Sequence, residues 1–267
     1  WYAWQSQKED QKKYSYILYG VLAVLVLADM VPVNKRFFGN DHFVKAKDAD
    51  TYFAIQPYEQ QILQDKDPNF RVLNLATNTF NDARTSYRLK SIGGYSAAKL
   101  RRYQDLIDEH ISHEMNPLMQ TIMQTQGFML PDANEGKDFP VLNMLNMKYA
   151  IVPLQGGTQA PVYNPYAMGN CWFVDEVILV DTPDEECAAL SSLDLHKQAV
   201  ADKKFAEALD ITKPEVTPLI AFDTTLIQLT SYAPNSLTYE SMNERNQVAV
   251  FSEIYYPYDW HLYIVNA

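Results

Sequence analysis

The sequence is poor in cysteine and in basic residues, and each shortage excludes a class of protein. Cys171 and Cys187 are the only cysteines among 267 residues, so a disulfide-rich or zinc-finger scaffold is excluded. The two thiols either form one disulfide in an oxidising compartment or remain as two buried thiols. With 22 Lys and Arg against 33 Asp and Glu, the net charge of −11 disfavours a nucleic-acid partner, which requires a broad basic face.

The sequence also lacks the glycine patterns that bind nucleotides. It has nine glycines, and none of them form a Walker or Rossmann spacing, so we expect no cofactor. Tyrosine, in contrast, is abundant: 18 Tyr, 12 Phe and 4 Trp bring the aromatic share to 13%. Such a composition favours β-structure and wet surfaces that contact carbohydrate or a membrane edge.

One apolar run lies near the start of the chain. Residues 14–33, YSYILYGVLAVLVLADMVPV, contain a single charged residue, Asp29. A helix of about 20 residues spans the hydrocarbon core of a bilayer, and Tyr14, Tyr16 and Tyr19 at one end are typical of an interfacial aromatic belt. We therefore expect the last transmembrane helix of a polytopic protein, of which this chain is a piece. A buried core helix and a signal peptide are the alternatives.

The remainder of the chain predicts an α+β fold. After a membrane segment at 1–36, helix and strand patterns alternate over 37–212, which indicates a mixed sheet with helices packed on it. From 213 to 267, short strand patterns separated by Pro and Asn turns indicate an antiparallel half-sandwich. We expect this last domain to be incomplete, because it has fewer strands than a closed sandwich.

Local patterns predict the individual elements. Strands are expected at RVLNL (71–75), at YAIV (149–152), within CWFVDEVILV (171–180) and in four C-terminal runs, of which the last is WHLYIV (260–265). Helices are expected after Pro57, from Ser96 to about His113, after Pro140, and after a capping box formed by Thr182 and Glu185.

The main electrostatic anomaly is a basic segment within an acidic chain. Residues 84–102 contain no acidic residue and six basic ones: Arg84, Arg88, Lys90, Lys99, Arg101 and Arg102. Beside a membrane, such a basic segment is a candidate surface for lipid phosphate or another anion. The alternative is a solvated face whose arginines pair with nearby acids, each pair contributing only about 0–1 kcal/mol.

Within the basic segment, IGGYSAA has three interpretations. A turn at Gly93 and Gly94 before a helix would offer free backbone N–H groups to an anion. Ser96 would instead be the nucleophile of a serine hydrolase, or it would cap the following helix. The nucleophile is the weakest of the three, because Arg88 and Lys90 interrupt the buried strand that a nucleophile elbow requires.

A second candidate surface lies in EIYYPYDW, residues 253–260. Glu253 is followed by Tyr255, Tyr256 and Trp260, and a carboxylate among aromatic rings is a common arrangement for holding sugars. No second carboxylate is positioned for a glycosidase pair, so the pattern indicates glycan binding without hydrolysis. A packed aromatic sheet edge is the alternative.

One group of histidines is close enough to consider as a metal site. His110, His113 and Glu114 would share one face of a helix. Two neighbouring imidazoles on a polar helix are usually solvated, and no further ligand is suggested nearby, so we expect no metal site.

Four blocks of the sequence resemble the YfhO family of bacterial polytopic membrane proteins, in the form found in Bacteroides-like bacteria. They occur in the family's order and cover nearly the whole chain: RVLNLATNTFNDARTSYRLKSIGGYSAAKLRRYQDLID, LNMLNMKYAIV, GNCWFVDEVILVD and VFSEIYYPYDWHLYI. The resemblance implies a membrane glycosyltransferase of the GT-C type, of which this chain would be the C-terminal extracytoplasmic region at the inner membrane. Family members are linked to glycosylation of cell-envelope polymers from a sugar carried on polyprenyl phosphate.

The resemblance also implies that this chain lacks the catalytic group. In that architecture the catalytic acid lies in a loop between early transmembrane helices, so no residue here inherits its role. The expected function is therefore recognition or support of the glycan or lipid-linked sugar. A non-catalytic envelope domain that binds glycan or organises partners is the alternative.

Overall fold

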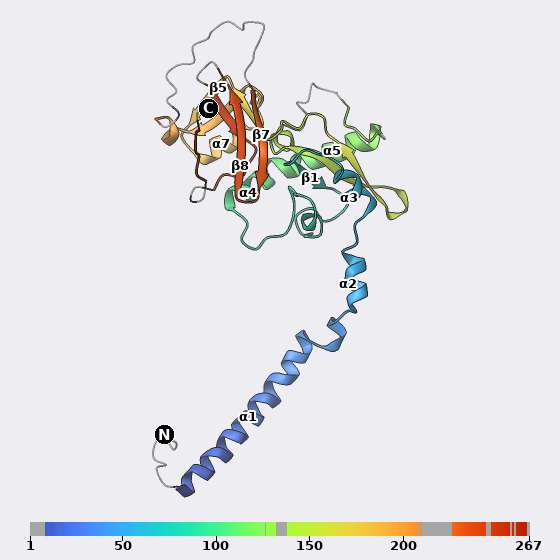
Figure 1. The fold of residues 1–267 in the computed structure, drawn as a ribbon, viewed down its shortest axis with the longest axis vertical. Coiled ribbons are helices and arrows are strands. Elements are labelled where there is room, and N and C mark those ends of the chain that lie inside the picture. Colours follow the sequence, from blue (N-terminus) through green and yellow to red (C-terminus); the bar gives the residue numbers. More distant parts are fainter. Residues whose placement is uncertain are drawn as a thin grey trace. The chain divides into compact units, whose positions relative to one another are not determined.

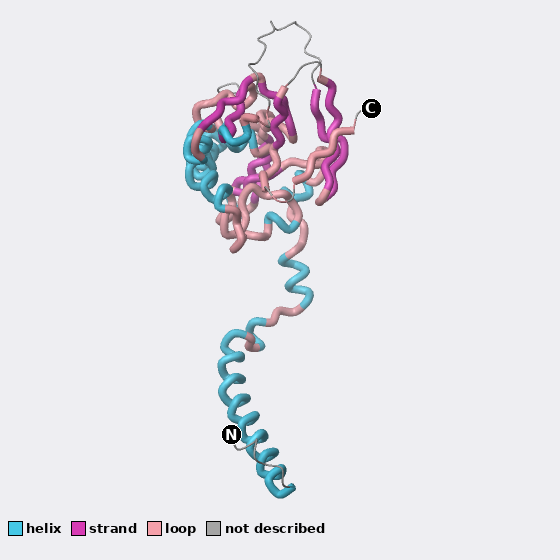
Figure 2. Tube along the Cα trace, turned by 90° about the vertical axis from the view of Figure 1, so that its left-hand side faces the viewer, coloured by secondary structure: helices cyan, strands magenta, loops and turns pink. Residues whose placement is uncertain are grey.

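The computed structural model describes residues 9–125, 127–131, 138–207, 209, 226–243, 247–256, 258 and 260–265. The chain divides into two compact units, residues 1–55 and residues 56–267. Helices, a mixed sheet and antiparallel strands near the C-terminus are all present, which confirms the expected α+β class. Figures 1 and 2 show the chain in two views at right angles.

The first unit consists of helices. Helix α1 (Glu9–Phe37) is followed by a 3₁₀ turn (Asn40–His42) and helix α2 (Ala46–Tyr52). The most apolar 18-residue window of the segment Tyr14–His42 has a mean hydropathy of 2.1, and none of that window is buried. This helix is long and apolar enough to cross a membrane by length and composition. Its apolarity is not explained by packing in a core of the described residues.

The second unit contains shorter elements, shown along the chain in Figure 1. In chain order they are α3 (Pro57–Ile62), β1 (Arg71–Asn74), a 3₁₀ turn (Thr85–Tyr87), α4 (Arg101–Leu106), a π-helical segment (Ile107–Ile111), α5 (Ser112–Thr125), α6 (Pro140–Met144), β2 (Met147–Pro153), a 3₁₀ turn (Gln155–Gly157), β3 (Gln159–Tyr163), β4 (Cys171–Val174), β5 (Glu176–Val180), α7 (Pro183–Ala189), β6 (Gln198–Asp202), a 3₁₀ turn (Lys203–Phe205), β7 (Leu226–Ala233), β8 (Ser236–Met242) and β9 (Val248–Phe251).

A mixed sheet is the centre of this unit. Strand β2 lies between β1, to which it is parallel, and β3, to which it is antiparallel. Successive strand residues point to opposite faces, and both faces of β2 are covered. Ala150 and Val152 contribute to a large apolar cluster, whereas Ile151 packs in a second cluster with Tyr58 and Ile62 of α3. Coverage on both faces explains why Ala150, Ile151 and Val152 follow one another as apolar residues in the central strand.

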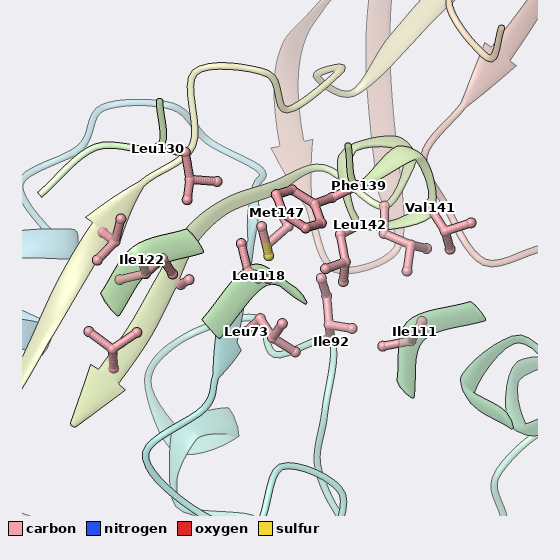
Figure 3. Packing of buried hydrophobic residues seen from close by; sticks show 14 of the residues in the cluster. Leu73, Ile92, Ile111, Leu118, Ile122, Leu130, Phe139, Val141, Leu142 and Met147 are labelled. Carbon is pink, nitrogen blue, oxygen red and sulfur yellow. The ribbon is translucent and has the colours of Figure 1, made fainter. Parts of the chain in front are cut away.

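The larger cluster joins the sheet to the helical segment. Leu73 of β1 and Met147 of β2 meet Ile111, Leu118 and Leu142, which come from the helical segments, and all five are fully buried (Figure 3). Burial of side chains of this size contributes about 1.5–3 kcal/mol each. This packing fixes the helical segment 101–125 against the sheet and thereby positions the residues just before it.

Three strand pairs complete the unit. Strand β5 pairs with β6 in parallel, β7 and β8 form an antiparallel hairpin, and β9 is antiparallel to β4. The hairpin strands β7 and β8 run side by side in Figure 1, and the strands are magenta in Figure 2. The expected domain boundary between residues 212 and 213 lies outside the described residues.

Two expected elements differ from the structure. The helix expected from Ser96 begins at Arg101 instead, with Leu100 as its N-cap. Ser96 closes a local turn, because its Oγ accepts a hydrogen bond from the N–H of Ala98 at 3.3 Å. The run at 260–265 alternates like a strand but is not one, because no strand of the described residues pairs with it. Alternation alone does not stabilise an unpaired strand in water.

The expected cap of α7 is confirmed with one change. The side-chain oxygen of Thr182 accepts a hydrogen bond from the N–H of Glu185 at 3.2 Å, as a capping box requires. The Glu185 carboxylate bonds back to the N–H of Asp181, one residue before the cap, at 2.9 Å. Both groups stabilise the start of the helix.

Candidate functional site

The first half of the basic segment surrounds a buried carboxylate. Glu59 of α3 is 1% exposed, and its Oε2 accepts a hydrogen bond from the N–H of Gln56 at 2.7 Å. Arg84 lies 3.6 Å from its Oε1, and Arg88 lies 3.8 Å from its Oε2. Arg84 also donates to the hydroxyl of Tyr58, whose pKa is raised, mainly by burial. These two arginines therefore balance a buried charge.

Lys90 belongs to a second internal network. Its ammonium donates to the side-chain oxygen of Asn69, and the Asn69 amide donates to Oε1 of Glu253 at 2.7 Å. Arg71 completes the network with an ion pair of 3.0 Å to Oε2 of Glu253. The Glu253 side chain is 20% exposed, so the acid expected to hold sugar instead fastens the segment after β9 to the start of β1.

The second half of the basic segment lies on the outside. Arg101 is 88% exposed and pairs with Asp105 at 2.7 Å, one helical turn further on. This pair is the exposed arrangement considered as the alternative to anion binding. The guanidinium carbon of Arg102 lies 5.9 Å from the ring centroid of Tyr255, and both side chains are exposed. Arg102 therefore stays accessible to an anionic ligand.

The aromatic residues after β9 are exposed, and one of them, Tyr255, lies beside Arg102; Glu253 does not belong with them. Tyr255 is 47% exposed, Tyr256 38% and Trp260 50%. The rings of Tyr256 and Tyr258 meet at 5.6 Å in an edge-to-face arrangement. Trp260 is held by a hydrogen bond from its indole N–H to the carbonyl of Ile254 at 3.1 Å. We call Arg102, Tyr255, Tyr256, Tyr258 and Trp260 the aromatic surface.

In the sequence, the basic segment and the aromatic run are two separate candidates. The structure brings one member of each together, Arg102 and Tyr255, although they are far apart in the sequence. No local pattern indicates this contact, because it depends on how the chain after β9 returns to helix α4. Rings next to a cation suit a ligand that has both a sugar-like face and an anionic group.

The turn at Gly93 and Gly94 does not form an anion cradle. The N–H of Gly93 donates to the hydroxyl oxygen of Ser91 at 3.1 Å, and the N–H of Gly94 donates to the carbonyl of Thr79 at 2.7 Å. The helix begins only at Arg101. The backbone N–H groups that an anion would use are therefore already bonded.

The structure does not bring a base to Ser96. Ser96 is exposed, and its Oγ bonds locally to the N–H of Ala98. No histidine among the described residues forms a hydrogen bond with it, so the arrangement of a nucleophile and its base is not formed here.

The His110, His113 and Glu114 group is divided by its surroundings. His110 is buried and its Nε2 lies 2.8 Å from the carbonyl of Cys187, whereas His113 is exposed. Glu114 accepts hydrogen bonds from the N–H groups of Val141 and Leu142, and burial raises its pKa to about 7. Among the described residues, no group of three or more metal-ligating side chains comes together.

The two cysteines are free thiols in the structure. Cys171 is buried in β4, and burial raises its pKa to about 11. The pKa of Cys187 is also raised, first by burial and then by nearby carboxylates. A raised pKa leaves both sulfurs protonated and unreactive at neutral pH.

Comparisons with protein-family models, with curated proteins and with solved structures give no match for this chain. The resemblance to the YfhO family therefore stays a prediction.

Proposed function

We propose that this chain is the membrane-anchored, extracytoplasmic C-terminal region of a glycosyltransferase-like envelope protein at the inner membrane. In this proposal the second unit recognises or supports a glycan, or the polyprenyl-phosphate-linked sugar, and does not carry the catalytic groups. The observation that carries the proposal is the aromatic surface with Arg102 at its edge. The resemblance of the four sequence blocks to the YfhO family is the basis for the proposed side of the membrane and the proposed class of reaction.

The chemistry of the aromatic surface supports a sugar ligand. Exposed Tyr and Trp rings present flat apolar faces together with a polar edge, which matches the alternating C–H and hydroxyl groups of a sugar ring. Trp260 and Tyr256 are held in place by their hydrogen bond and ring contact, so little side-chain entropy is lost on binding. Arg102 adds a charged donor for a phosphate or an acidic sugar.

Helix α1 supports the anchoring part of the proposal. Its apolar side chains are exposed along its length, and they would be stable in lipid. Lys35 and Arg36 lie in its last turn. Cations at this position are stabilised by the helix dipole and are typical of a membrane surface. A domain carried on such a helix acts on substrates close to the bilayer.

The test is glycan binding by the full chain reconstituted in nanodiscs, with teichoic acid as the probe and neutral dextran for comparison. Tyr255→Ala and Trp260→Ala should each weaken binding of teichoic acid about tenfold, which corresponds to about 1.4 kcal/mol. Tyr87→Ala is the matched control, because Tyr87 is 62% exposed and lies outside the aromatic surface. Equal loss in all three variants, or no binding by the wild-type chain, would contradict glycan recognition.

A second measurement tests the absence of catalysis. The same nanodiscs are supplied with a sugar on polyprenyl phosphate and an envelope glycan acceptor. We expect no sugar transfer, because the aromatic surface contains no carboxylate among its described members. Transfer by this chain alone would contradict the proposed division between recognition and chemistry.

A further inference from the structure

A small pocket lies between the glycine turn and the helical segment. It has a volume of about 280 Å³, and most of its wall is apolar, from Phe80, Ile92, Tyr95, Tyr103 and Ile107. The hydroxyl of Tyr103 already donates to the carbonyl of Ile92 at 2.6 Å, so Tyr103 contributes its ring and not a free donor. Pockets for drug-sized ligands have about 300–1,000 Å³, so this one accommodates a single ring with a head group.

Gly93 and Gly94 line this space. A Cβ atom at Gly93 would lie 2.1 Å from the carbonyl oxygen of Thr79, and Gly94 has a φ of +111°. Both positions therefore require glycine. Their N–H groups are bonded to Ser91 and Thr79, so they form a wall and do not bind a ligand. Recognition has to come from side chains.

Lys99 is the cation of the pocket. Most residues from 95 to 101 are exposed, but Lys99 is half-buried and its ammonium lies 5.5 Å from the ring centroid of Phe80. Lysine is normally solvated or paired when it is drawn inward. No carboxylate of the described residues lies within ion-pair distance of Lys99, and the pocket lining contains no acid. Arg101, two residues later, pairs with Asp105 instead.

Two hydroxyls complete the polar part of the pocket. Ser86 and Ser96 both line it. The Oγ of Ser96 accepts from the N–H of Ala98, which leaves its own hydrogen to donate. An apolar wall with one cation and two hydroxyls is the pattern of a site for a ring that carries a negative charge.

We propose that this pocket binds a small organic anion, a phosphate or carboxylate on an apolar or aromatic ring, with Lys99 as its charged partner. The proposal goes beyond the recognition of glycan by the aromatic surface and does not depend on it. Arg102 follows Arg101 on α4 but does not line the pocket. The two sites can therefore be removed separately by substitution.

The experiment measures binding to the full chain in nanodiscs by isothermal titration calorimetry. The probes are phenyl phosphate and benzoate. Phenol is the control that lacks the negative charge, and inorganic phosphate is the control that lacks the ring. Phenyl phosphate or benzoate should bind at least about tenfold more tightly than phenol and inorganic phosphate. The binding of either ring anion should weaken as the salt concentration rises, because the contact with Lys99 is electrostatic.

Variants locate the site. Lys99→Gln should reduce the affinity for the ring anions about tenfold and remove their advantage over phenol, and Lys99→Arg should restore part of it. Lys66→Gln removes the same charge at an exposed lysine outside the pocket and should leave binding unchanged. Ser86→Phe should block the pocket while Lys99 remains.

Three results would overturn the proposal: no binding of either ring anion, binding unaffected by both Lys99→Gln and Ser86→Phe, or equal loss in Lys66→Gln. Far-UV circular dichroism of each variant shows whether the fold is intact. Glycan binding in the Lys99→Gln variant distinguishes the two sites, because the aromatic surface should be unaffected.

Discussion

The two halves of the basic segment have the same sign of charge and opposite surroundings. Arg84, Arg88 and Lys90 reach inward to Glu59 and Asn69, which are buried. In the outer half, Arg101 pairs with Asp105 at the surface, and Lys99 and Arg102 lie near the rings of Phe80 and Tyr255. A stretch that is uniformly basic in sequence is therefore partly internal framework and partly accessible surface.

This difference shows why a count of basic residues overstates an anion-binding surface. A buried carboxylate needs a partner, because transfer of an isolated charge out of water costs several kcal/mol. Glu59 therefore uses two of the six cations, and the Asn69–Glu253 network uses a third. In the second half Arg101 pairs with Asp105, so Lys99 and Arg102 are the cations that remain for a ligand.

The largest expected effect on the free energy of unfolding is at Glu59, the buried partner of the inner half of the basic segment. Glu59→Ala leaves Arg84 and Arg88 without their buried partner and removes the cap of α3, so we expect a loss of about 4 kcal/mol in the free energy of unfolding. Asp105→Ala, which removes the partner of Arg101 in the outer half, is the control and should cost about 0.5 kcal/mol. Urea unfolding followed by tryptophan fluorescence measures both. Similar losses in the two variants would show that the halves do not differ.

A second prediction concerns Glu114. This buried carboxylate pairs with no cation of the described residues, in contrast to Glu59. Glu114 is held by two backbone N–H groups, and burial raises its pKa from 4.5 to about 7. Between these values the unfolded chain loses its proton while the folded chain keeps it. Stability therefore falls as the pH rises from about 4.5 to about 7, and the contribution of Glu114 is roughly 3 kcal/mol.

Glu114→Gln removes this titration. The free energy of unfolding of the variant, relative to wild type, should rise by roughly 3 kcal/mol between pH 4.5 and pH 8. Denaturant unfolding at several pH values provides the measurement. A difference between the two proteins that does not change with pH would contradict a raised pKa at Glu114. Glu185→Gln, on the exposed start of α7, is the matched control.

Much of the fold could be predicted from local patterns. The strand at RVLNL, the strand at YAIV and the capped helix after Thr182 follow from apolar runs and end signals that act within a few residues. The prediction that a helix begins at Ser96 was wrong, because the Oγ of Ser96 accepts its hydrogen bond in a local turn before the helix. The strand expected at 260–265 was wrong, because a strand depends on a partner that the local sequence does not reveal.

The candidate site was less predictable for the same reason. The sequence marks Glu253 and Tyr255 as neighbours, but Glu253 bonds to Arg71 and Asn69 while Tyr255 faces Arg102. Each of these contacts joins residues that are far apart along the chain. The pocket had no local signal either, because Lys99 lies before the first residue of α4 and its i, i+4 spacing to Tyr103 does not place the two side chains on one helical face.

The smallest expected effect is at Arg101, and it tests the outer half of the basic segment directly. Arg101→Ala removes an exposed pair at i, i+4, and such pairs contribute about 0.3–0.5 kcal/mol at low salt. We therefore expect a loss of at most about 0.5 kcal/mol in the free energy of unfolding, and none at 1 M salt, where the Debye length falls to about 3 Å. Arg84→Ala is the matched change in the inner half and should keep most of its larger cost at high salt, because Glu59 is screened from solvent. If salt removed the effects of both substitutions equally, burial would not be what separates the two halves.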